Sequence, residues 1–140
     1  SVSNARSSCL CQTLLTLGSI TLRYLHLVLE TAMHLMKEEN ILFPYMQALE
    51  SASPPVAHFG TVANPIRMMM MEHEHDSLIL NKMLEVTEHF TLPSGACASY
   101  TALYSGLNEL VSDLFQHIRL ENDIVFPKAI ETEKSLHGQA

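Results

Sequence analysis

The chain has 140 residues, enough for one domain with a sizeable core, and 47% of them are hydrophobic while only 16% are charged. This composition excludes an extended disordered protein. The formal net charge is −7 with only eight Lys and Arg, which leaves no basic face for phosphate backbones and argues against nucleic acid as a partner.

The N-terminal region predicts an irregular or short helical segment, because Gly18 interrupts its apolar pattern. Cys9, Cys11 and Cys97 make an odd number of cysteines without a paired framework, which favours a reducing compartment. The Cys9-x-Cys11 spacing is not the usual Cys-x2-Cys, and a redox or metal pair stays open. The uncharged stretch 7–22 lacks an Ala-x-Ala cleavage site and is too short to span a bilayer, so we expect a cytoplasmic protein with no membrane attachment.

Three long helices are predicted next, from about residues 20–50, 65–89 and 96–130, with a loop over 51–64 and a turn over 91–95. Each helix carries an apolar stripe whose members recur at three- and four-residue steps. The stripes comprise Leu22, Leu25, Leu29, Met33 and Met36 in the first helix, Met68, Met71, His75, Leu78, Met83 and Val86 in the second, and Leu103, Leu107, Leu110, Leu114, His117 and Glu121 in the third. No segment shows the alternation or the turns of a sheet.

The predicted fold is therefore all-α, an up-down bundle of three long helices with a short N-terminal segment. The N-terminal segment covers residues 1–19, the bundle domain covers 20–133 and a tail covers 134–140.

One motif, His-x3-Glu-x2-Ile-x-Phe-Pro, occurs twice, at residues 34–44 and 117–127. A step of four residues puts the His and the Glu of each copy on one helix face, one turn apart. The proline that ends each copy removes a backbone donor and crowds a carbonyl, so a kink or a helix end is expected there. Two copies indicate two equivalent helices that present imidazole and carboxylate to a common centre.

A polar run, Glu-His-Glu-His-Asp at residues 72–76, lies in the otherwise apolar middle helix. Burying ionised carboxylates costs several kcal/mol unless they are paired or bind a cation, so we expect a metal centre. His73 and His75 point about 200° apart, so only one of them can face that centre, and we assign His75. The mixed nitrogen and oxygen set suits iron, manganese or zinc, and carboxylates that can bridge favour two ions. The predicted ligands are His34, Glu38, His75, His117 and Glu121.

Two further carboxylates lie one turn before the repeated histidines. Glu30 precedes His34 by four residues and Asp113 precedes His117 by four. Such groups could orient the imidazoles or carry protons, and the alternative is an ordinary solvated charge on the helix surface.

These motifs resemble those of hemerythrin-like di-iron proteins, and among them the iron-sulfur cluster repair proteins known as repair of iron centres. The resemblance covers about residues 20–130. It rests on the two His-x3-Glu copies, on Pro65-Ile66-Arg67 followed by Met71-Glu72-His73-Glu74-His75-Asp76, and on Asn108-Glu109-Leu110.

The resemblance implies two non-haem iron ions in an Fe–O–Fe type centre inside the bundle. By that resemblance His34, His75 and His117 would be terminal ligands, Glu38 and Glu121 bridging carboxylates, and Glu30 and Glu74 acidic groups close to the centre.

The implied function is the repair of iron-sulfur clusters damaged by nitrosative or oxidative stress, by iron delivery. Damaged iron-sulfur proteins and the small molecules NO and O2 are then the expected partners, and the chain is closer to a metal-binding repair protein than to a classical enzyme. The alternatives are a hemerythrin-like module that binds or senses oxygen or nitric oxide, and a metal-free truncated helical interaction protein.

The last alternative arises because the family's bundle has a further helix, with another metal-binding histidine, ahead of the helix that bears His34. Residues 1–25 contain no histidine, so the first bundle helix is expected to be lacking. A bundle without it would expose an apolar groove, through which homo-oligomers could form.

Overall fold

The computed structural model describes the backbone of residues 2–51 and 56–137 and the side chains of residues 21–51 and 56–136. Within these ranges the protein is all-α and has no strand. The elements are α1 (Val2–Lys37), η1 (Glu38–Leu42), α2 (Phe43–Leu49), α3 (Ala63–Val86), α4 (Ala98–Leu120), η2 (Glu121–Val125) and α5 (Phe126–His137). No helix among the described residues is long and apolar enough to cross a membrane.

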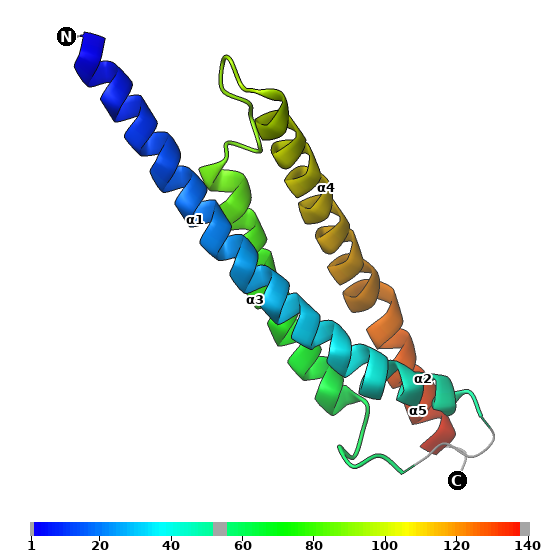
Figure 1. Cartoon of the computed structure of the whole chain (residues 1–140). Helices are drawn as coiled ribbons and strands as arrows, with labels where there is room; N and C mark the ends of the chain where they lie inside the picture. Colours follow the sequence, from blue (N-terminus) through cyan, green and yellow to red (C-terminus); the bar gives the residue numbers. More distant parts are fainter. Residues whose placement is uncertain (1, 52–55, 138–140) are drawn as a thin grey trace.

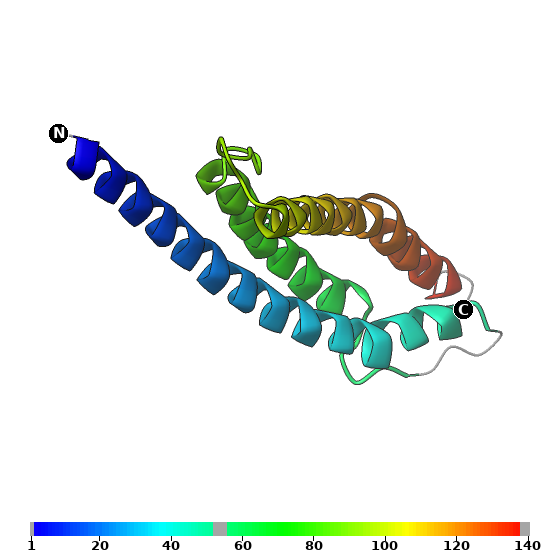
Figure 2. The ribbon, with the colours of Figure 1, turned by 45° about the horizontal axis from the view of Figure 1, so that its top comes forward.

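The helices form long rods that run up and down alternately, as Figures 1 and 2 show. The first rod is α1–η1–α2, the second is α3, and the third is α4–η2–α5. Along the bundle α1 packs on α3, α3 on α4, and α2 on α5. The predicted all-α bundle of three long helices is confirmed.

The N-terminal part differs from the expected separate segment, because α1 continues through Gly18 without a break. A single glycine costs a helix interior only about 1 kcal/mol relative to alanine, which the flanking turns can tolerate. The side chains of Cys9 and Cys11 lie outside the described residues, whereas Cys97 is an exposed free thiol. At the other end α5 includes residues 134–137, which were expected in a tail.

Two separate apolar clusters stabilise the part of the bundle that the structure describes. One lies in the half where α1, α3 and α4 meet and comprises Leu27, Ile79, Leu80, Met83, Phe90, Tyr104, Leu107 and Val111. The other lies in the half where α2, α3 and α5 meet and comprises Leu42, Tyr45, Leu49, Val62, Ile66, Met69, Phe126 and Ala129. The rods pass from one cluster to the other, and the residues between them along each rod include buried polar groups.

Most of the apolar stripe predicted on the first two helices is exposed, which corrects that part of the prediction. Leu29 is 68% exposed on α1, and Met71 is 59% exposed on α3. The buried face of α3 comprises instead Ile66, Met69, His73, Asp76, Ile79, Leu80 and Met83. Both faces of these helices carry apolar residues, so periodicity alone does not decide which face packs inward.

A π-helical turn stands at each of the two places where the sequence predicts a helix distortion. In η1 the backbone N–H of Phe43 donates to the carbonyl of Glu38, and in η2 Phe126 does the same to Glu121. Pro44 has no backbone N–H and so cannot make an α-helical hydrogen bond. The wider π turn, in which the hydrogen bond spans five residues, lets Pro44 lie in the first turn of α2. Each π turn begins at the glutamate of the repeated motif.

Candidate metal centre

A cluster of histidines and glutamates lies between the two apolar clusters, and every rod contributes to it. Its members are His34 of α1, Glu38 of η1, His73 of α3, His117 of α4 and Glu121 of η2. One ligand atom from each lies within 4.8 Å of all the others. Four of these side chains are almost completely buried, whereas the side chain of His117 is 37% exposed.

Each glutamate in this cluster faces histidines from two different rods. Glu38 lies 3.1 Å from His34 Nε2 and 3.9 Å from His117 Nε2. Glu121 Oε2 lies 3.2 Å from His73 Nε2 and 3.2 Å from His117 Nε2. The two carboxylates therefore occupy the middle of the cluster, and the three imidazoles surround them.

Hydrogen bonds on the outer side of two imidazoles set their orientation. His34 Nδ1 donates to Glu72 Oε2 at 2.8 Å, and His73 Nδ1 donates to Asn122 Oδ1 at 2.8 Å. The His73 ring also stacks on Phe126, with 5.7 Å between the centroids and 9° between the planes. With Nδ1 protonated, the Nε2 atom of each ring is directed into the cluster, which is how metal-binding histidines are usually held.

The negative charge of the cluster changes the pKa of its members. Burial lowers the pKa of His34, but the hydrogen bond to Glu72 and the negative charges of Glu38 and Glu72 outweigh it and raise this pKa to about 9. Burial raises the pKa of Glu121, yet the neighbouring imidazoles of His73 and His117 hold it below its usual value. In the metal-free protein a proton on His34 therefore offsets part of the negative charge of the two glutamates.

Several atoms of the cluster are shielded from solvent and have no hydrogen-bond partner among the described residues. They are both carboxylate oxygens of Glu38, Glu121 Oε2 and His117 Nε2. Buried lone pairs of this kind carry the full cost of desolvation unless a cation binds them. Imidazole nitrogens with carboxylate oxygens form a donor set typical of iron, manganese and zinc, so the residues fit a metal centre.

The structure brings together four of the five residues that the sequence assigned to this centre and replaces the fifth. His73, not His75, lies beside His34, with 3.0 Å between their Nε2 atoms. His75 is exposed and lies near His26 and Glu30. The prediction for α3 was therefore wrong about which face of the helix packs inward. It placed Met68 and Met71 on the buried face together with His75, whereas both methionines are exposed.

The three carboxylates expected around the centre also lie elsewhere. Glu30 lies beside His26, with 3.1 Å between its Oε2 and His26 Nε2, and is grouped with His26 and His75 rather than with His34. Glu74 is exposed and belongs neither to the buried cluster nor to the group of His26, Glu30 and His75. Asp113 is exposed and borders an adjoining cavity.

Two groups that orient the histidines were missed by sequence reasoning. Glu72 accepts from His34 and also pairs closely with Lys37, and these two contacts hold its pKa down although burial raises it. Asn122 accepts from His73. The signal available in the sequence was the position of each beside an assigned or candidate ligand, because Glu72 adjoins His73 and Asn122 adjoins Glu121.

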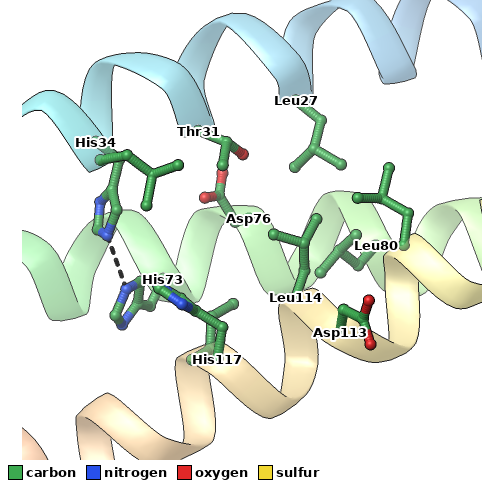
Figure 3. Close-up of a pocket in the computed structure, with 12 residues that line it drawn as sticks. Leu27, Thr31, His34, His73, Asp76, Leu80, Asp113, Leu114 and His117 are labelled. Carbon is green, nitrogen blue, oxygen red and sulfur yellow. Dashed lines mark hydrogen bonds between the residues drawn. The ribbon is translucent and has the colours of Figure 1, made fainter.

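A cavity of about 250 Å³ adjoins the cluster between α1, α3 and α4. Figure 3 shows the three histidines toward one end of this cavity and Leu27 and Leu80 toward the other. Its lining is predominantly apolar. A small uncharged molecule could therefore reach the imidazoles from this side.

Comparisons with known proteins point to one family. The family model described as the hemerythrin HHE cation-binding domain matches residues 8–129. A probable iron-sulfur cluster repair protein of Haemophilus influenzae is 41% identical over 101 residues, which are 72% of this chain and 42% of the relative. The iron-sulfur cluster repair protein YtfE of Edwardsiella ictaluri is 40% identical over 97 residues, 69% of this chain and 40% of the relative. The chain spans less than half the length of these curated relatives.

Proposed function

Because the chain belongs to the hemerythrin HHE cation-binding family, we propose that it holds a non-haem di-iron centre and takes part in the repair of iron-sulfur clusters damaged by nitrosative or oxidative stress. The observation that carries this proposal is the buried cluster of three histidines and two glutamates with unpartnered carboxylate oxygens. The names of the relatives, which are iron-sulfur cluster repair proteins, supply the process.

The proposed ligands are those that the structure brings together. In this proposal His34, His73 and His117 would supply the nitrogen ligands, and Glu38 and Glu121 would supply the carboxylate oxygens. Each glutamate lies between histidines of two rods, so each carboxylate could serve two ions. This arrangement supports a pair of ions over one.

Iron delivery is the form of repair that we propose. A bound Fe(II) pair supplies both a redox-active centre and a source of iron. Four of the ligand side chains are buried. Two of them are held in orientation, His34 by Glu72 and His73 by Asn122 and the stacked ring of Phe126. His117 is the most exposed member of the cluster, so the bundle is most open to solvent at this ligand, where iron could pass to a client protein.

A direct test uses an aconitase-type iron-sulfur enzyme inactivated by nitric oxide. The full chain, reconstituted anaerobically with iron, is expected to restore its activity more than an equal amount of free Fe(II). Glu38→Gln should bind less iron and lose the effect, whereas Glu39→Gln, a change at the exposed neighbouring residue, should keep it. If the chain is fully loaded with iron and still restores no more activity than free Fe(II) does, the repair role is refuted.

The second candidate function is a module that binds oxygen or nitric oxide without repairing clusters. The apolar cavity that ends at the three histidines favours it, since both gases partition into apolar space. Such a module would change its optical spectrum on exposure to the gas and leave the damaged enzyme inactive. The cytoplasmic location, the client proteins and self-association stay predictions.

A further inference from the structure

A second group of potential metal ligands lies on the outer side of the bundle, away from the buried cluster. His26 and Glu30 stand one turn apart on α1, and His75 approaches them from α3. His26 Nε2 lies 3.1 Å from Glu30 Oε2, and His75 Nε2 lies 3.5 Å from the same oxygen. The two imidazole rings meet edge to face, with their centroids 6.0 Å apart.

These spacings match those between ligands of one tetrahedral ion. Zinc–nitrogen and zinc–oxygen bonds of about 2.0–2.1 Å place neighbouring ligand atoms about 3.3 Å apart. Two imidazoles and one carboxylate are also a ligand set that zinc uses where the fourth position is left to water.

The state of the carboxylate supports a ligand role independently. The Glu30 side chain is 40% exposed, but its Oε2 atom is shielded from solvent and has no hydrogen-bond partner among the described residues. This is the same oxygen that both imidazoles face. A cation held by the three groups would bind the lone pairs that are otherwise left without a partner.

We propose that His26, Glu30 and His75 bind one zinc-class divalent ion at a surface site that is separate from the buried centre. The two sites share no ligand. Asp76 stands between them, since it borders both the inner cavity and the outer groove that contains Glu30 and His75. Because His26 and His75 are exposed, the outer ion exchanges with solvent more readily than ions in the buried centre.

The experiment is equilibrium dialysis of the full chain, freed of metal by chelation, against Zn²⁺, followed by elemental analysis. Wild type is expected to bind one zinc equivalent more than His26→Asn or His75→Asn. His58→Asn, at an exposed histidine outside both clusters, is the matched control and should equal wild type. His117→Asn, which alters the buried centre, should retain the outer ion, so that failure at one site is distinguishable from failure at the other.

A second measurement uses the wild-type protein alone, so it does not depend on whether a variant folds. In wild-type protein with isotope-labelled histidines, Zn²⁺ is expected to shift the imidazole resonances of His26 and His75 together and to leave that of His58 in place. Equal zinc stoichiometry in wild type, His26→Asn and His75→Asn would overturn the proposal. Unshifted His26 and His75 resonances at saturating Zn²⁺ would do so as well.

Discussion

His34 and His73, which come from different rods of the bundle, face each other with 3.0 Å between their Nε2 atoms. The outer nitrogen of each ring is already engaged, with Glu72 in one case and Asn122 in the other. One proton fits between the two Nε2 atoms in the metal-free protein, where His34 Nε2–H donates to His73. A metal ion that binds here must displace this proton and then has both lone pairs available.

The choice between the two histidines of α3 gives the first prediction. His73→Asn should abolish most iron binding at the buried centre, because it removes the imidazole that faces His34, whereas His75→Asn, outside that cluster, should retain the iron of the buried centre. Iron content after anaerobic reconstitution measures both.

Thermal unfolding checks the same pair independently. Iron should raise the melting temperature of wild type and His75→Asn but not of His73→Asn, because only a ligand bound to the folded state stabilises it. If iron left every melting temperature unchanged, the metal-free interaction protein would be the better description.

The orientation of His34 by Glu72 gives the second prediction. Glu72→Gln should lower iron affinity by about 10- to 100-fold, because the amide is a weaker acceptor for the Nδ1 proton than the carboxylate and no longer pairs with Lys37. Glu74→Gln, an exposed carboxylate two residues along the same helix, serves as the control and should change affinity little. Competition with a chromophoric chelator measures both affinities. Equal losses in the two variants would point to overall charge and not to the hydrogen bond.

A buried glutamate outside the candidate metal centre gives the third prediction. Glu133 of α5 accepts the Tyr45 hydroxyl at 2.8 Å and the Val62 backbone N–H at 2.9 Å, and thereby joins three parts of the bundle. Glu133→Ala leaves both donors buried without a partner and should lower the free energy of unfolding by about 2 kcal/mol. Urea denaturation of the metal-free protein measures this change.

Two variants separate the lost hydrogen bonds from other effects at this position. Glu133→Gln retains an acceptor oxygen and should cost less than Glu133→Ala. Glu131→Ala, an exposed position on the same helix, should cost little. If Glu131→Ala lowered the free energy of unfolding as much as Glu133→Ala, the loss would come from a change in helix propensity and not from the buried contacts of Glu133.

The pKa of His34 gives the fourth prediction, for the metal-free protein. Its pKa rises from 6.5 to about 9 on folding, so the folded state binds the proton more tightly than the unfolded state does. The resulting stabilisation is fully present below about pH 6.5 and is lost as the pH rises through about 9. Urea denaturation in the presence of a chelator should therefore show a greater loss of stability over this range in wild type than in His34→Gln.

An exposed histidine provides the control for this pH dependence. His58→Gln should follow wild type throughout the range, because its imidazole lies outside both clusters. Parallel curves for wild type and His34→Gln would show that another group governs stability there. Since the same proton must leave when a metal binds, iron affinity should rise with pH over this interval.

The repeated motif shows how far the sequence alone could predict this protein. Its two copies place a histidine and a glutamate one turn apart on two helices, and those four side chains meet in the structure. The prolines that end the copies predict the helix distortions, which are the π-helical turns beginning at Glu38 and Glu121. These are local consequences of spacing and of proline chemistry, so they need no knowledge of the packing.

The helix between the copies shows where such reasoning ends. The sequence established that His73 and His75 could not both face the centre, but the methionines on both faces of α3 left its rotation undecided. The tertiary structure decided it in favour of His73, which stacks on Phe126 and bonds to Asn122 from another rod. These contacts join residues far apart in the chain, so they depend on how the rods pack. The same packing placed Glu30 and His75 together on the outside, because turning one face of a helix inward turns the opposite face toward solvent.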